Sequence, residues 1–159
     1  MVIKDSTISA DGMYAVQAIL AANGTINLIN SNVNAITRNE KTALSATPIF
    51  NRATFIATNS NLHGDAMFDD ADHPCADGIS NYGMAILNNT NVTGTINGFS
   101  NNVGGQAYIN GGTFTGHSHG GFYLAHGIDG IAWINDAVIR CGNYDGIFDY
   151  SGNVVSESG

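Results

Sequence analysis

A short pattern recurs along the whole chain and constrains the fold more than any other feature. Each copy sets an apolar residue between polar ones, and these apolar residues, called anchors here, follow one another at spacings of 25, 29, 30, 22 and 25 residues. Repeats with a period of roughly 20–50 residues are typical of solenoids. The anchors are Ile8, Val33, Leu62, Val92, Phe114 and Ile139.

Three more columns agree when the copies are aligned on their anchors. Five positions before the anchor the residue is apolar, three before it the residue is Asn, Asp or Gly, and two after it the residue is small. The apolar column is Ile3, Leu28, Ala57, Leu87, Ile109 and Ile134. The Asn, Asp and Gly column is Asp5, Asn30, Asn59, Asn89, Gly111 and Asp136. The column of small residues is Ala10, Ala35, Gly64, Gly94, Gly116 and Cys141.

Each copy predicts a strand, a sharp bend and a second strand. The bend falls on the Asn, Asp and Gly column, because these residues tolerate the left-handed backbone region that a tight corner needs. After the bend polar and apolar residues alternate, as in Asn91, Val92 and Thr93. This period of two is typical of a strand with one buried face.

A third strand in each copy is predicted where a glycine precedes apolar residues, at 12–16, 121–124 and 146–150. Residues 11–24 also fit an amphipathic helix that stops at Gly24. We favour a strand there, because the segment lies in phase with the other glycine-apolar starts.

Composition limits the class of protein. The 159 residues include 43% apolar residues, which is enough for one domain over 1–159 with a real core. Twenty Asn and 20 Gly suit many tight turns.

A net charge of −8 with only 5 Lys plus Arg argues against nucleic acid as a partner. Cys75 and Cys141 lack the spacing of a zinc site. No run has the length of a membrane span, and no basic and apolar leader is present.

Residues 141–155 and 87–94 resemble coils of the pectin lyase-like right-handed parallel β-helix superfamily. That superfamily includes polysaccharide lyases, glycoside hydrolases, phage tailspikes and autotransporter passenger domains. Repeat and resemblance together predict an all-β fold, a single-stranded right-handed parallel β-helix of about six coils with 22–30 residues each. The resemblance further implies a ladder of stacked amides at the corner. Its positions match Asp5, Asn30, Asn59, Asn89 and Asp136, and Gly111 departs from it.

The segment 63–78 concentrates carboxylates in one stretch. Clustered carboxylates suit Ca²⁺, a hard cation with oxygen ligands, although no cofactor is required. In related lyases such side chains hold Ca²⁺ against a uronate, and in related hydrolases paired Asp side chains supply acid and base. Asp69 and Asp70 are the catalytic candidates on that resemblance, and a plain solvated loop is the simpler interpretation. The candidate metal ligands are Asp65, Asp69, Asp70, Asp72 and Asp77.

Two further candidates for catalysis lie later in the chain. His117 and His119 are two residues apart, so on a strand they point the same way and could transfer protons. By analogy with the resembled family, His119 or Arg140 would take the proton or clamp a sugar. The plainer interpretations are a polar turn at 116–121 and an ordinary surface arginine.

A less expected column lies six residues before the anchors. The next column is already the inward apolar one, so alternation sends this column outward although five of its six members are apolar. An outward apolar stripe marks a ligand or partner surface, unless a loop of the same chain covers it. Tyr108 and Trp133, on adjacent coils, should stack there and are the candidate ligand-binding residues. The column is Val2, Asn27, Ile56, Ile86, Tyr108 and Trp133.

No complete catalytic constellation is present, so the sequence favours a non-catalytic surface or carbohydrate-binding module over an enzyme. The alternative is a polysaccharide lyase or glycoside hydrolase, or a fragment of one. The third hypothesis is ice binding, from the outward Thr and Asn columns that flank the anchors. Both ends break off at nearly the same phase of the repeat without a cap, which predicts a homo-oligomer or a piece of a longer solenoid. We expect an extracellular or cell-surface location.

Overall fold

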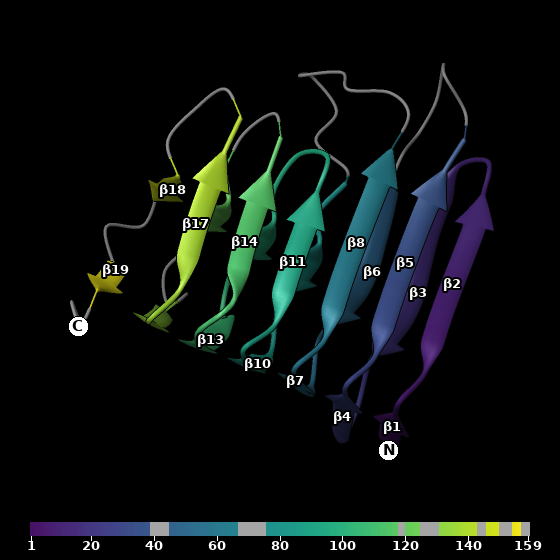
Figure 1. Ribbon diagram of the computed structural model, residues 1–159, viewed down its shortest axis with the longest axis horizontal. Coiled ribbons are helices and arrows are strands. Elements are labelled where there is room, and N and C mark those ends of the chain that lie inside the picture. The colour runs from purple at the N-terminus through teal and green to yellow at the C-terminus, as the bar shows by residue number, and fades with distance from the viewer. Residues whose placement is uncertain are drawn as a thin grey trace.

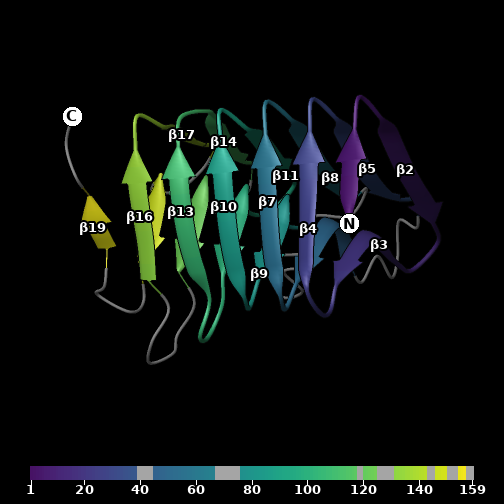
Figure 2. The same ribbon diagram turned by 90° about the horizontal axis from the view of Figure 1, so that it is seen from below.

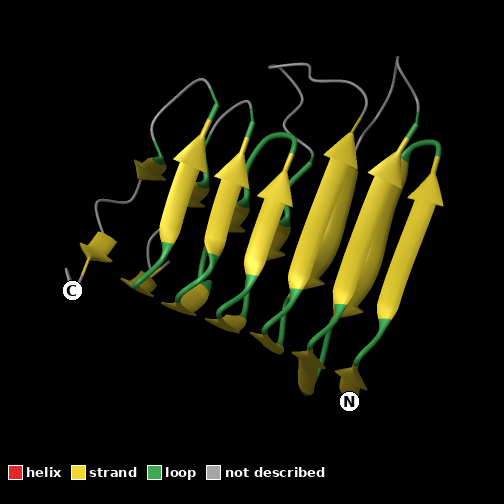
Figure 3. Cartoon of the chain, viewed as in Figure 1, coloured by secondary structure: helices red, strands yellow, loops and turns green. Residues whose placement is uncertain are grey.

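The computed structural model describes residues 1–38, 45–66, 76–117, 120–124, 131–142, 146–149 and 154–156. Within these ranges the regular structure consists of strands, with no helix (Figure 3). Three parallel sheets contain all of the strands, and they are called sheets A, B and C.

The strands of each sheet are as follows. Sheet A contains β1 (Val2–Lys4), β4 (Thr25–Ile29), β7 (Thr54–Thr58), β10 (Met84–Asn88), β13 (Gln106–Asn110), β16 (Ile131–Asn135) and β19 (Val154–Ser156). Sheet B contains β2 (Thr7–Gly12), β5 (Asn32–Thr37), β8 (Asn61–Ala66), β11 (Asn91–Gly94), β14 (Thr113–Gly116) and β17 (Val138–Cys141). Sheet C contains β3 (Ala15–Ala21), β6 (Ser45–Asn51), β9 (Ile79–Asn81), β12 (Phe99–Asn101), β15 (Phe122–Leu124) and β18 (Ile147–Asp149).

The chain visits the three sheets in turn and then begins again one layer further along. Each strand therefore pairs with the strand three places later in the sequence, always in parallel. Figure 1 shows sheet B as a row of strands from β2 to β17, and Figure 2 shows the same succession for sheet A. The fold is an all-β parallel solenoid, which confirms the fold class predicted from the repeat.

The strand register confirms the sequence alignment. In sheet B the anchors pair in one continuous column, with Ile8 opposite Val33, Leu62 opposite Val92 and Phe114 opposite Ile139. All copies pair in the same phase because a slip of one residue would turn every apolar side chain outward.

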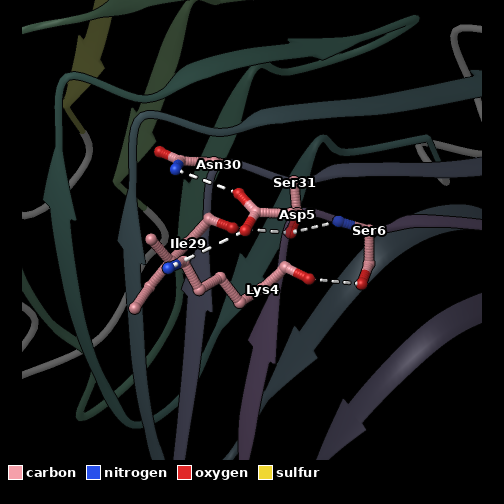
Figure 4. Close-up of polar contacts among 6 residues, drawn as sticks. All are labelled: Lys4, Asp5, Ser6, Ile29, Asn30 and Ser31. Carbon is pink, nitrogen blue, oxygen red and sulfur yellow. Dashed lines mark hydrogen bonds and ion pairs between the residues drawn. The ribbon is translucent and has the colours of Figure 1, made fainter.

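The corner between sheets A and B is built as predicted. Among the described residues, those with positive φ other than glycine are the corner column Asp5, Asn30, Asn59, Asn89 and Asp136, with φ between 45° and 51°, and Gly111 has a φ of 72°. Figure 4 shows the first two layers, where Asn30 Nδ2 donates to Asp5 Oδ1 over 3.1 Å. Asn89 Nδ2 donates in the same way to Asn59 Oδ1 over 3.0 Å. The amides thus link successive layers at the corner where the backbone is left-handed.

The interior consists of stacked apolar columns from all three sheets. Leu28 of sheet A, Val33 of sheet B and Ile49 of sheet C are completely buried. The small column two residues after the anchors has a clear cause at Gly94 and Gly116. A Cβ at Gly94 would meet the Asn97 carbonyl oxygen, and one at Gly116 would meet that of Gly120, closer than any van der Waals contact. Small residues are needed because the turn into sheet C passes directly over this position.

The third strand is present in the six layers that begin with β1, β4, β7, β10, β13 and β16. The segments predicted at 121–124 and 146–150 coincide with β15 and β18, but the segment predicted at 12–16 is out of phase. Residues 11–24 contain the strand β3 and no helix, as we favoured. Gly12, however, ends β2 and is not the equivalent of Gly121. The register shows instead that Gly121 corresponds to Gly98 and Gly78, which directly precede the buried residues Phe99 and Ile79. The prediction was wrong by part of a strand because Gly12 also precedes apolar residues, Met13 and Tyr14, which are in fact exposed.

A second asparagine ladder lies inside the solenoid and was not predicted. Asn51 Nδ2 donates to Asn81 Oδ1, and Asn81 Nδ2 donates to Asn101 Oδ1, each over 2.7 Å. All three side chains are at most 1% exposed. They close the turn from sheet C back to sheet A by also donating to backbone carbonyls, such as those of Met84 and Gly105. Buried amides are acceptable here because the ladder satisfies them.

Candidate functional site

The outer face of sheet A carries the apolar stripe that the sequence predicts. Along β10 and β13 the side chains alternate between fully buried and partly exposed positions. Ile56, Ile86, Tyr108 and Trp133 occupy the partly exposed positions and pair in register on successive strands. The stripe therefore lies on the surface of the molecule.

Tyr108 and Trp133 form a parallel stack on this face. Their ring centroids are 4.4 Å apart and their planes differ by 5°. The separation follows from the fold, since neighbouring strands of a sheet lie about 4.8 Å apart and in-register side chains repeat at that distance. The stack itself is worth about 0.5–1.5 kcal/mol beyond the burial of area. The two rings therefore hold one another in a fixed orientation and act as a rigid aromatic pair.

A shallow groove of about 200 Å³ runs beside this aromatic pair. Its lining combines the rings with two corner amides, Asn110 and Asn135, which can both donate and accept hydrogen bonds. Asn110 also donates to Asn88 Oδ1 over 3.1 Å, so its amide is oriented by the previous layer. The remaining lining residues are Ile109 and Ile134, so among the described residues no charged side chain lines the groove.

Neighbouring outward positions widen the apolar surface. Met84, two residues before Ile86 on β10, is 37% exposed. Ile131 holds the equivalent position before Trp133 and is partly exposed. Gln106 lies between these two residues in the same column, so Met84 and Ile131 add separate apolar positions beside the predicted stripe.

Two of the five predicted metal ligands fall in the part of the chain that the structure describes. Asp65 lies on β8 of sheet B, where its carboxylate accepts from Thr95 Oγ1 over 3.2 Å. Asp77 precedes β9 of sheet C and accepts from Asn97 Nδ2 over 2.9 Å. Across the described ranges, no group of three or more His, Cys, Asp or Glu side chains could hold a metal ion. Asp69, Asp70 and Asp72 lie outside the described residues.

Asp77 is the one described ionisable group with a clearly altered environment. Burial raises the pKa of Asp77 to about 6, and the hydrogen bonds from Asn97 and Ser100 only partly offset this effect. Its hydrogen-bond partner Asn97 is 4% exposed and accepts from the Gly120 N–H over 3.3 Å. The carboxyl is thus part of a chain of hydrogen bonds that runs from layer to layer, in keeping with a structural position.

Arg140 lies on a different sheet from the aromatic pair. It is exposed on β17 of sheet B, opposite Thr115 of the previous strand, whereas Trp133 lies on β16 of sheet A. His117 is exposed at the end of β14, and His119 lies outside the described residues. Arg140 is the one catalytic candidate within the described residues, since Asp69 and Asp70 also lie outside them.

The outer face of sheet B is a polar array with internal bonding. Asn61 Nδ2 donates to Asn32 Oδ1, and Asn91 Nδ2 donates to Asn61 Oδ1, each over 2.9 Å. These amides satisfy one another, which leaves fewer of their groups for ordered water. The array is also interrupted by His63 and Arg140.

A second aromatic cluster was missed by the sequence analysis. The Arg52 guanidinium lies 5.0 Å from the Phe50 ring centroid and 5.9 Å from that of Tyr82. The two rings are 5.3 Å apart and tilted by 36°. Phe50 pairs in register with Ser80 and not with Tyr82, so no column of the alignment contains both rings. Only the folded turn between sheets C and A brings them together.

Comparisons with protein-family models, with curated proteins and with solved structures gave no match. The structure contains no helix, in the ranges it describes, that is long and apolar enough to cross a membrane. The surfaces described above are therefore the basis for inferring a function.

Proposed function

We propose that this chain is a non-catalytic carbohydrate-binding module of the pectin lyase-like β-helix type that works outside the cell. The observation that carries the proposal is the parallel stack of Tyr108 and Trp133 on the outer face of sheet A. A rigid aromatic pair on a sheet is preorganised, so little conformational entropy is lost when a ligand binds.

The chemistry of the groove suits a sugar. A sugar ring presents apolar C–H groups as well as hydroxyl groups, and the groove offers aromatic surface beside the amides of Asn110 and Asn135. Because the described lining residues are all uncharged, we expect a neutral sugar to bind here better than a uronate. The groove is shallow, and this favours a segment of an extended polysaccharide over an enclosed small molecule.

The test uses the single tryptophan of the chain. Trp133 is the only indole, so its fluorescence reports this site alone. Glycan-array screening would identify a ligand, and titration of that ligand should change the emission in a saturable way. Tyr108→Ala should weaken binding about tenfold or more, since truncation of an aromatic anchor commonly costs more than about 1 kcal/mol. Tyr82→Ala, which removes an exposed ring at another corner, is the matched control and should bind normally.

Product analysis separates this proposal from the enzyme alternative. The bound polysaccharide would be incubated with the protein, and chain shortening or unsaturated ends would be measured. Turnover would overturn the non-catalytic assignment and direct attention to Asp69, Asp70, His119 and Arg140. Unchanged polysaccharide together with saturable binding would support the module.

A second copy of the chain is the competing occupant of the same face. Met84, Ile86 and Trp133 form a partly exposed apolar surface that a homo-oligomer could bury. Light scattering over a concentration series distinguishes the two occupants. A dimer that dissociates in Trp133→Ala and binds no glycan would identify the face as a self-association surface.

A further inference from the structure

The sequence contains three Asn-Gly pairs, and the structure places them in three different environments. They are Asn23-Gly24, Asn97-Gly98 and Asn110-Gly111. In this dipeptide the backbone nitrogen of glycine can attack the preceding asparagine side chain, because glycine has no Cβ to hinder the approach. The reaction needs a free nucleophile, a mobile amide and access for water. The three pairs meet these conditions to different degrees.

The pair Asn97-Gly98 is locked. Asn97 is 4% exposed, its Nδ2 donates to Asp77 over 2.9 Å, and its Oδ1 accepts from Gly120 over 3.3 Å. The Gly98 N–H, which would have to attack, donates to the Gly120 carbonyl over 3.1 Å. Both reacting groups are therefore held in place.

The pair Asn110-Gly111 is exposed at the asparagine but is tied by hydrogen bonds. Asn110 Nδ2 donates to Asn88 Oδ1 over 3.1 Å, and the Gly111 N–H donates to the Asn135 carbonyl over 2.9 Å. These bonds link three successive layers of sheet A. The attacking nitrogen is engaged as long as the layers stay together.

The pair Asn23-Gly24 lies in an exposed turn between β3 and β4. Both residues are exposed, Gly24 has a φ of +71°, and no heavy atom lies within 4 Å of the place where a Cβ would stand. Among the contacts of the described residues, no hydrogen bond holds the Asn23 side chain or the Gly24 N–H. The Gly24 carbonyl alone is engaged, as acceptor for Thr54 N–H over 3.1 Å.

We propose that Asn23 is a site of spontaneous deamidation. The Gly24 nitrogen attacks Cγ of Asn23, an N–C bond closes a cyclic succinimide, and the Cγ–Nδ2 bond breaks. The departing nitrogen takes up the proton released by the Gly24 N–H and leaves as ammonia. Water then opens the ring at either carbonyl and gives aspartate or isoaspartate, without any change of oxidation state.

The products change the surface in two ways. Each adds a negative charge to a chain that already carries a net charge of −8. Isoaspartate also lengthens the backbone by one methylene group next to the residue that bonds to Thr54 in the following layer. We therefore expect deamidation of the solenoid to begin at this turn from sheet C to sheet A.

The deamidation rates of the three Asn-Gly pairs can be compared within one protein sample. The folded chain would be incubated at mildly alkaline pH, digested, and analysed by mass spectrometry for replacement of the amide NH₂ by OH. Asn23 should convert at least about tenfold faster than Asn97 or Asn110, because a local opening free energy of only about 1.4 kcal/mol slows a protected site by that factor. In denaturant the three rates should become similar. An intact Asn23 in the folded chain, or equal rates at the three sites, would overturn the proposal.

Two variants confirm the position of the modification. Asn23→Gln should remove the acidic species that appears on ion-exchange chromatography, and Asn23→Asp should elute with one of the products. Both substitutions lie on an exposed turn and should leave the unfolding temperature unchanged. An acidic species that accumulates in Asn23→Gln at the original rate would place the reaction elsewhere and refute the assignment.

Discussion

Replacement of Asp77 by asparagine should stabilise the protein at neutral pH. Burial raises the pKa of this carboxyl from 3.8 to about 6, so the folded state favours the protonated acid. Asparagine has nearly the shape of that acid and cannot ionise. It also keeps the oxygen that accepts from Asn97 Nδ2 over 2.9 Å.

The magnitude and sign follow from proton linkage. Between about pH 4 and pH 6 the folded chain binds more protons at Asp77 than the unfolded chain does, so the free energy of unfolding falls as the pH rises. At about 1.4 kcal/mol for each unit of pKa, the ionised Asp77 costs roughly 3 kcal/mol above pH 6. The gain from Asp77→Asn should therefore be near zero at pH 4 and rise to roughly 3 kcal/mol by pH 7.

Urea unfolding of both proteins at several pH values measures this difference, and the other titrating groups cancel in the comparison. Asp77→Ala is the control: it loses the acceptor for Asn97 but does not titrate. Its free energy relative to Asp77→Asn should be the same at every pH. If Asp77→Asn is less stable than the natural protein at pH 7, or if its effect does not depend on pH, burial of the carboxyl is not the cause of the shift.

Three further predictions concern stability. Trp133→Ala should reduce the free energy of unfolding by less than about 3 kcal/mol, because the ring is partly exposed and its stack on Tyr108 adds about 0.5–1.5 kcal/mol to the area it buries; a loss of about 3–5 kcal/mol in urea unfolding, as for a buried ring, would contradict the outward position. Asn81→Ala should cost about 3 kcal/mol or more in the same assay, because it removes the acceptor for one N–H of Asn51 and the donor to Asn101 Oδ1 inside the buried ladder. A normal midpoint would show that water replaces the ladder. Gly94→Ala should give little folded protein by circular dichroism, since its Cβ would collide with the Asn97 carbonyl. Gly104→Ala, with open space around it, should fold despite its positive φ.

The aromatic pair is the part of the candidate site that the sequence predicted. The alignment placed Tyr108 and Trp133 in one outward column, and the structure has them stacked at 4.4 Å. The amides of Asn110 and Asn135 beside them were not singled out, although they occupy one column two residues further along the same strands. Residues two apart on a strand point to the same side, so the alternation that placed the rings outward also places these amides beside them.

Local physical chemistry determined the parts of the fold that sequence alone predicts. The positive φ of Asp5, Asn30 and Asn89 is a preference of single residues, and the alternation of Asn91, Val92 and Thr93 needs only a strand with one buried face. Each of these two preferences involves only a few neighbouring residues, and their regular repetition along the chain predicts the solenoid.

Tertiary structure decided the features that depend on what lies in the next layer or on the next sheet. The sequence sets Asp77 in an acidic stretch that looks solvated, but the fold buries its carboxyl against Asn97 and so raises its pKa. Asn51 and Asn81 look like ordinary turn residues, yet the chain closes around them and makes their amides a buried ladder. Whether a side chain is buried, and which group it bonds to, depends on residues far apart in the sequence. Both are therefore decided only when the layers stack.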